Sequence, residues 1–209
     1  MAPFSHLVTS VEELRAGGYP EPAQRAWDKE ITALDGHCAR FLALSPFAVL
    51  ATTDAAGTVT ATPRGGPPGF LRVLDEHRLA FADLTGNRRI DALRDIVEHP
   101  RVGLLVLVPG MRETLRIHGT AHLTRDPAVL RAVDVPDRTA DLAVGIAVDN
   151  AFLQCGKALV RSQLWDPATW PERDELPSAA QAYRDHRASG ETADDVARHL
   201  EDAYRTALW

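Results

Sequence analysis

The chain has 209 residues, of which 45% are hydrophobic and 25% charged, as is ordinary for a soluble globular protein with one large domain. Its formal net charge of −6 argues against nucleic acid as a partner, because general nucleic-acid binding requires a basic face. The longest apolar run, Val102 to Pro109, is far too short to span a membrane, so no membrane partner is expected.

Cys38 and Cys155 are the only cysteines, too few for a disulfide framework or a zinc site by themselves. No metal site is therefore predicted, and Cys155 is expected to be a packed thiol. The N-terminus lacks the basic region and apolar run of a secretory signal. Together these features predict a reducing, cytoplasmic location.

The predicted elements begin with a loose arm over residues 1–22, which contains two glycines and two prolines. Apolar side chains then recur at helical spacing up to Ser45-Pro46, which ends the helix. The predicted helices cover residues 23–44, 88–98, 128–132, 152–165, 178–188 and 193–207. The predicted strands cover residues 47–53, 58–62, 71–74, 78–84, 102–108, 114–123 and 142–148.

Two of these strands have distinct patterns. Residues 102–108 are apolar without alternation, as for a strand buried on both faces, whereas residues 114–123 alternate. A stiff loop over residues 65–69 separates the first two hairpins. This order predicts a mostly β (α+β) protein with flanking helices, whose six or seven antiparallel strands curl into a small barrel.

Residues 81–94 carry the clearest sign of a ligand. A strand is predicted to end at Phe81, a turn follows, and Arg88 and Arg89 open a helix. The positive end of the helix dipole and its free N–H groups favour an anion, and the two guanidinium groups suit phosphate oxygens. The sequence therefore predicts a small phosphorylated ligand. Asp91 and Asp95, on the same helix, are expected to be solvated.

Five segments carry a family likeness: residues 49–54, 62–70, 86–93, 99–105 and 155–165. Through them the chain resembles the pyridoxamine 5′-phosphate oxidase-like FMN-binding split-barrel proteins, over roughly residues 27–166. The resemblance implies a split barrel of the FMN-binding type over residues 23–166, preceded by the arm 1–22. Residues 167–209 would form a connector and helices packed on the barrel or on a partner chain.

The resemblance also implies the cofactor site. Arg64 would contact the phosphate or ribityl chain, the backbone at Ala82 and Asp83 the isoalloxazine edge, and the basic pair of residues 88–89 the phosphate. Flavin in this family lies at the interface of a homodimer, so the Lys157–Trp165 segment is expected to complete the partner's site. The implied FMN-binding residues are Arg64, Gly65, Ala82, Asp83, Asn87, Arg88, Arg89, Thr114, Lys157, Arg161 and Trp165.

The implied function is an FMN-dependent oxidoreductase acting on an unidentified small organic substrate, and the sequence assigns no catalytic residue. Pyridoxamine phosphate is not the expected substrate, because no late arginine-x-histidine motif follows Trp165. The alternatives are a non-catalytic flavin- or haem-binding protein, with His118 or His122 as an axial ligand, or a deazaflavin-dependent reductase. The two histidines lie roughly 13 Å apart on one strand, too far to share a metal ion.

Overall fold

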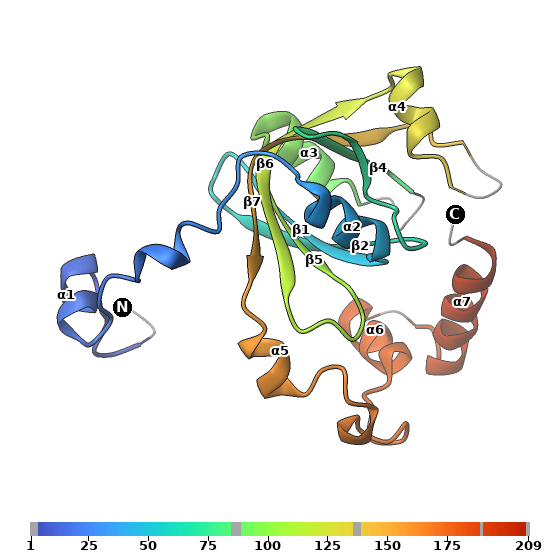
Figure 1. Ribbon diagram of the computed structural model, residues 1–209. Helices are drawn as coiled ribbons and strands as arrows, with labels where there is room; N and C mark the ends of the chain where they lie inside the picture. The colour runs from blue at the N-terminus through green and yellow to red at the C-terminus, as the bar shows by residue number, and fades with distance from the viewer. Residues whose placement is uncertain (1–3, 85–88, 136–138, 189, 208–209) are drawn as a thin grey trace.

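The chain folds around one antiparallel sheet of seven strands, as the computed structural model shows (Figure 1). The structure describes residues 4–84, 89–135, 139–188 and 190–207. Across the sheet the strands follow the order β2-β1-β5-β6-β7-β4-β3, and every neighbouring pair is antiparallel. Their bounds are β1 Phe47–Thr53, β2 Val59–Gly65, β3 Arg72–Asp75, β4 Arg78–Ala82, β5 Arg101–Leu107, β6 Thr114–Thr124 and β7 Ala143–Gln154.

The sheet curls but does not close. Within the described ranges β2 and β3, the two outermost strands, form no ladder with each other, so the barrel is split along one side. The predicted fold, a mostly β split barrel of six or seven antiparallel strands with flanking helices, is confirmed.

Short α-helices flank the sheet. Their bounds are α1 Val11–Ala16, α2 Gly36–Leu44, α3 Asp91–Glu98, α4 Pro127–Ala132, α5 Lys157–Ser162, α6 Ala179–Arg187 and α7 Ala193–Thr206. Most begin with a side chain that accepts a free N–H of the first turn, namely Ser10, Asp35, Asp126, Ser178 and Thr192. Helices α3 and α5 begin without a side-chain cap, at Ile90 and Gly156.

The inner face of the sheet forms the core. Leu50, Leu104 and Ile117 lie side by side on β1, β5 and β6, and each is at most 2% exposed. Helix α2 adds Phe41 and Leu42 to the same cluster. Burying one such side chain stabilises the fold by roughly 1.5–3 kcal/mol relative to leaving it exposed.

The outer face of β5 is only half-buried in one chain. Gly103, Leu105 and Leu107 alternate with buried neighbours, and Leu105 pairs with Val49 of β1. The prediction that residues 102–108 are buried on both faces is therefore wrong for the single chain, because only the inner face is fully buried. The outer face of the central strands is apolar and half-exposed.

The predicted helix over residues 23–44 is wrong for its first half. Helix α2 begins after Asp35, whose carboxylate accepts the Cys38 N–H at 2.8 Å, and Ile31 instead pairs with Ala151 of β7. Earlier residues form only a 3-10 turn, Gln24–Ala26. The N-cap at Asp35 competes with helix continuation and outweighs the apolar spacing before it. The sequence does not predict α1 either.

Strand β7 is longer than predicted, because residues 152–154 continue it instead of starting a helix. It pairs with β6 along its whole length, with a bulge between His118 and Gly119. A Cβ on Gly119 would lie 2.3 Å from the Ala147 carbonyl oxygen, so the two strands approach too closely there for any other residue. The predicted helix over residues 152–165 shrinks to α5.

Helix α3 is anchored by a buried polar contact. Asp95 is 1% exposed, and its carboxylate accepts a hydrogen bond from Thr52 Oγ1 at 2.7 Å. The expectation that Asp95 is solvated is therefore wrong, because its helix face packs on β1. This bond anchors the middle of α3 to β1.

Beyond the barrel, α6 and α7 pack on each other. Helix α7 begins with a capping box, in which Thr192 and Asp195 each accept from the other's backbone N–H, as its acidic first turn indicates. In the portion of the chain that the structure describes, no helix is both long and apolar enough to cross a membrane.

Candidate functional site

Strand β2 carries the first predicted cofactor residue to the split of the barrel. The strand continues to Gly65 rather than ending at Thr62, so Arg64 lies within it. Arg64 pairs with Ala48 and Thr62 pairs with Leu50, and both partners face the core. Arg64 and Thr62 therefore project from the inner face at the free edge of the sheet.

Both side chains bury polar atoms. Arg64 Nε and Thr62 Oγ1 make no hydrogen bond with any residue that the structure describes. An unsatisfied buried group costs about 1–3 kcal/mol, and more when it is charged. Such groups in native proteins call for an explanation, commonly a bound ligand or water. The edge of β2 thus offers hydrogen-bonding groups suited to a ligand.

Asp83 lies close enough to Arg64 on β2 for the two charges to interact. It directly follows β4, and its N–H donates to the Leu142 carbonyl oxygen at 2.9 Å. Burial raises the pKa of the Asp83 carboxyl, although the charge of Arg64 opposes this, and burial lowers the pKa of the Arg64 guanidinium. The two charges influence each other, yet neither group forms an ion pair with a described residue. A polar ligand can therefore use a donor on one side and an acceptor on the other.

Two further predicted residues lie beside this pair. Gly65 ends β2 opposite Phe47, and Ala82 ends β4 opposite Ala143. The structure thus brings Gly65 and Ala82 together with Arg64 and Asp83 at the split. We call this group of four residues, Arg64, Gly65, Ala82 and Asp83, the Arg64 corner.

The loop after β2 makes a fixed wall beside this corner. Gly66 N–H donates to the Pro46 carbonyl oxygen, and Gly69 N–H donates to that of Ser45, both at 3.1 Å. Gly69 has a φ of +85°, which glycine adopts without strain. These bonds tie the loop to the chain before β1, in agreement with the predicted stiffness.

The residues predicted to hold the phosphate precede α3. Asn87 and Arg88 lie outside the described residues. Arg89 donates from Nε and Nη2 to Asp91 Oδ2, at 2.8 and 2.7 Å. The helix begins at Asp91 rather than at Arg88, and Ile90 provides no side-chain cap. The first N–H groups of α3 and its dipole therefore still favour an anion.

The remaining predicted residues gather at a second place, the turn between β5 and β6. Lys157 and Arg161 lie one turn apart on α5 and line a cavity of about 470 Å³ together with Arg112. Glu113 is the only acidic residue in that lining, and none of the three cations forms an ion pair within the described ranges. We call this cluster of Arg112, Lys157 and Arg161 the α5 corner.

Close packing holds α5 against the turn. A Cβ on Gly156 would lie 2.7 Å from the Arg112 carbonyl oxygen, so only glycine fits there. Trp165 Nε1 donates to the Met111 carbonyl oxygen at 2.8 Å, which uses its N–H inside its own chain. Thr114 begins β6 beside this turn and is 7% exposed.

The two corners are separate within one chain. Arg64 and Leu115 lie in one row across the sheet with β1 and β5 between them, which is three strand spacings, or roughly 14 Å. Thr114 precedes Leu115 and therefore faces the opposite side of the sheet. A single chain thus does not bring Thr114 and the α5 corner to Arg64.

The two cysteines differ in environment. Cys155, directly before α5, is exposed, so the predicted packed thiol is wrong for it. A hydrogen bond from the Lys157 N–H, with smaller effects of the Lys157 and Lys29 charges, lowers the pKa of the Cys155 thiol. Cys38 is buried, and burial raises the pKa of its thiol to about 11.

The histidines on β6 do not converge on a ligand site. His118 Nδ1 lies 3.0 Å from Asn150 Oδ1, and its ring meets Phe152 edge to face. His122 is exposed. Among the residues described, no group of three or more His, Cys, Asp or Glu side chains is placed to hold a metal ion.

Two polar residues of these corners are not predicted from the sequence. Thr62 lies two residues before Arg64, so strand alternation alone would have placed both on one face. Arg112 lies in the β5–β6 turn, where no periodic pattern indicates its neighbours.

The chain is similar to known proteins in sequence pattern and in fold. The model of the family described as pyridoxamine 5′-phosphate oxidase matches residues 34–153, more than half of the chain. No curated protein matches the chain. Similar solved structures include HupZ of Group A Streptococcus (16% identity, TM-score 0.48, 58% of this chain and 99% of that chain). The General Stress Protein 26 of Bacillus anthracis is 14% identical with a TM-score of 0.40, and the match covers 56% of this chain and 93% of that chain. The heme storage protein HutZ of Vibrio cholerae is 12% identical with a TM-score of 0.40, and the match covers 58% of this chain and 94% of that chain.

Proposed function

Because the chain belongs to the pyridoxamine 5′-phosphate oxidase family, we propose that it is an FMN-dependent oxidoreductase acting on a small organic substrate. One observation carries the proposal. Arg64 has a buried Nε without a described acceptor, and it lies close enough to Asp83 for the two charges to interact. Keeping a charged group buried and unpaired is costly, so a ligand that accepts its hydrogen bonds explains it.

The surrounding residues fit a flavin phosphate ester. Arg64 and Thr62 offer donors, Asp83 an acceptor, and the uncapped N-terminus of α3 suits a phosphate. Arg88 and Arg89 are our candidates for the phosphate itself, with Asn87 beside them. Ala82 and Gly65 supply backbone at the strand ends next to Arg64.

We propose further that two chains form each site. Thr114, beside the α5 corner, lies three strands from Arg64 and faces the opposite side of the sheet, so this corner and Trp165 would serve the flavin of the partner. The half-buried apolar outer face around Val49 and Leu105 supports a homodimer that covers it. Each flavin would then lie between the Arg64 corner of one protomer and the α5 corner of the other.

When bound, the flavin supplies hydride or electron transfer, and the protein supplies binding, orientation and exclusion of water. Arg64 and Asp83 orient the ring system and phosphate chain by hydrogen bonds. The fastened loop over residues 66–70 excludes water on one side. We propose a cytoplasmic location, where the free thiols of Cys38 and Cys155 stay reduced.

The protein as purified should carry, or take up, FMN. We expect quenching of flavin fluorescence on titration with FMN, and much weaker binding of riboflavin, which lacks the phosphate. Equal affinity for the two ligands, or no binding of either, would overturn the proposal. Mass spectrometry of the released cofactor identifies the alternatives directly, because haem or a deazaflavin would appear in place of FMN.

A further inference from the structure

The segment before the barrel carries apolar side chains that are packed against no core. From here on, the arm means residues 4–28, that is, the described part of the predicted arm 1–22 together with the residues that follow it up to Asp28. Its large apolar side chains are each at least 40% exposed, among them Phe4, Leu7, Val8, Val11, Leu14 and Tyr19. Exposed apolar side chains concentrated in one short segment, rather than scattered singly over the surface, are typical of an interaction site.

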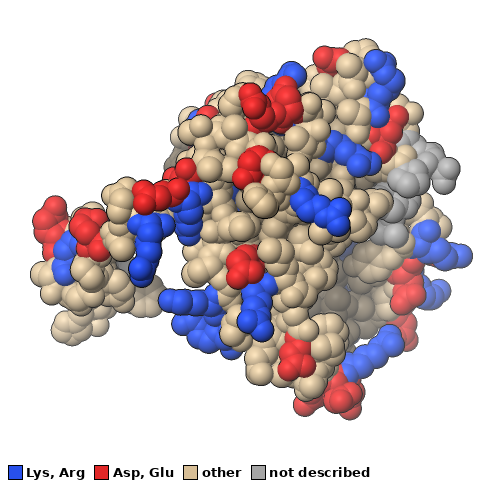
Figure 2. Space-filling view, in the orientation of Figure 1, with Lys and Arg blue, Asp and Glu red and all other residues tan. Residues whose placement is uncertain are grey.

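The arm also makes its polar contacts within itself. Ser10 caps α1, Arg15 pairs with Glu21, and Gln24 Nε2 donates to Asp28 Oδ1 at 3.0 Å. In the described chain, the first backbone bond from this end to the barrel is that between Ile31 and Ala151. Figure 1 shows α1 held away from the sheet, and Figure 2 shows the arm clear of the body.

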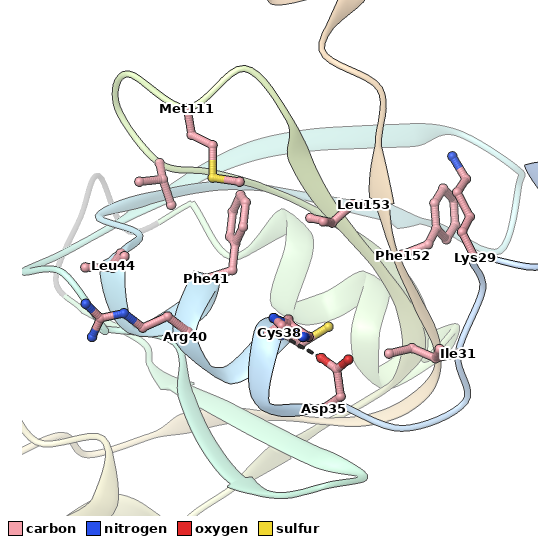
Figure 3. Close-up of a pocket in the computed structure, with 12 residues that line it drawn as sticks. Lys29, Ile31, Asp35, Cys38, Arg40, Phe41, Leu44, Met111, Phe152 and Leu153 are labelled. Carbon is pink, nitrogen blue, oxygen red and sulfur yellow. Dashed lines mark hydrogen bonds between the residues drawn. The ribbon is translucent and has the colours of Figure 1, made fainter.

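The barrel in turn has an apolar cavity outside both corners. A space of about 470 Å³ lies between α2, the β5–β6 turn and the end of β7. Ile31, Phe41, Met111 and Leu153 line it (Figure 3). Leu44 and Leu153 are 44% and 43% exposed, so the apolar wall is open to the outside.

Charges at the rim fit an acidic, apolar occupant. Arg40 and Lys29 line opposite ends of the cavity (Figure 3). The Asp35 carboxylate is already used to cap α2, where it accepts the Cys38 N–H. Helix α1 presents Val11 and Leu14 beside Glu12 and Glu13. The whole arm contains four carboxylates and two arginines, so it is acidic overall.

We propose that the arm of each protomer seats α1 in this cavity of a second copy. The arm leaves the barrel at Ile31, on the wall of its own cavity, and the turns over residues 24–30 lead it outward, so a second copy is within easier reach. Exchanged arms are a low-cost route to dimers. The inference rests on the homodimer in the proposed function and uses no flavin-site residue.

Cross-linking between two differently tagged full-length proteins tests the exchange. Both carry Cys155→Ser; one also carries Val11→Cys and the other Leu44→Cys. After mixing and mild oxidation, we expect a disulfide-linked heterodimer joining positions 11 and 44, seen on a non-reducing gel and by peptide mass spectrometry. The matched control puts Tyr204→Cys in place of Val11→Cys, since Tyr204 and Val11 are 63% and 62% exposed.

Each other outcome overturns the exchange. If no cross-link forms, or if the Tyr204→Cys control cross-links equally, then α1 does not contact the cavity. A further variant carries Val11→Cys and Leu44→Cys in the same chain. If only this variant forms the cross-link, within one chain, the arm folds back on its own barrel. Light scattering and FMN titration on the same samples keep the proposed function separate: a flavin-binding dimer without the cross-link refutes the arm exchange alone.

Discussion

The Arg64 corner and the α5 corner each contain a cation without an ion-pair partner among the described residues, yet they differ in burial. Arg64 is half-buried at a strand edge with its Nε fully buried, and its charge interacts with that of Asp83. Lys157 and Arg161 lie on an exposed short helix around an open cavity. Under the proposed function, the half-buried corner is a preorganised half-site, whereas the exposed corner acquires a defined ligand only when the surface of a second chain meets it. Four predictions test this difference.

Arg64→Met should have the largest effect. Losing one charged hydrogen bond removes about 1.5–3 kcal/mol, so the Kd for FMN should rise about 10- to 150-fold in fluorescence titration. Thermal unfolding of the cofactor-free protein should be unchanged or shifted upward, because the half-buried Arg64 forms no ion pair with any residue that the structure describes. Arg78→Met, at an exposed arginine paired with Asp75, is the control and should leave FMN binding intact. Unchanged affinity in Arg64→Met would remove the Arg64 corner from the site.

Mixing two defective variants tests whether the corners of different chains meet. Arg64→Met and the double variant Lys157→Ala/Arg161→Ala should each bind FMN poorly. If each site uses one corner from each chain, random heterodimers rebuild one intact site, so about a quarter of all sites should recover tight binding. Recovery is measured by titration after subunit exchange. A site contained in one chain would recover nothing.

Asp83→Asn should change the pH dependence of stability. Burial raises the pKa of Asp83 above its ordinary 3.8, so the folded state holds this proton more tightly than the unfolded chain. Its stabilising contribution is present below pH 3.8 and is lost as the pH rises through the raised pKa. In urea unfolding, the variant should therefore gain stability relative to the wild type from about pH 4 upward.

Asp54→Asn is the control of opposite sign. A hydrogen bond from the Thr58 N–H holds the pKa of the Asp54 carboxyl below its ordinary value. Asp54 therefore contributes stability above pH 3.8, and its variant should lose stability relative to the wild type over the same range. Equal slopes for the two variants would contradict the burial of Asp83.

The smallest effect concerns the thiol beside the α5 corner. Cys155 is exposed with a lowered pKa, whereas burial raises that of Cys38 to about 11, so iodoacetamide at neutral pH should label Cys155 alone. FMN should slow this labelling several-fold if the α5 corner covers a flavin. Mass spectrometry of timed samples gives both rates. If FMN does not change the labelling rate of Cys155, the α5 corner does not contact the cofactor.

Sequence reasoning succeeded where the signal was local. Alternation placed β6, turn residues bounded the first hairpins, and the acidic start of α7 predicted its helix. It failed where two local signals competed. The apolar spacing from Trp27 onward imitates a helix, but the Asp35 cap and the pairing of Ile31 with β7 decide the structure.

The sequence indicated the candidate site residues one by one but not their arrangement. The family likeness indicated Arg64 and Asp83, yet their burial and mutual influence depend on how far the sheet curls, which no local pattern encodes. The separation of Thr114 from Arg64 likewise follows from strand order and face. Arg112 joins the α5 corner only because Gly156 lets α5 pack against the β5–β6 turn.

The split of the barrel also leaves two sheet edges on which another protein's strand could add. Both are guarded against such aggregation. Strand β2 contains Pro63, and proline is tolerated in a sheet where its missing N–H would point away from the ladder, so that edge offers one donor fewer. Strand β3 has only four residues, an irregular register before Asp75 and a charged residue at each end. The chain can thus keep an open barrel in a crowded solution without recruiting strands from its neighbours.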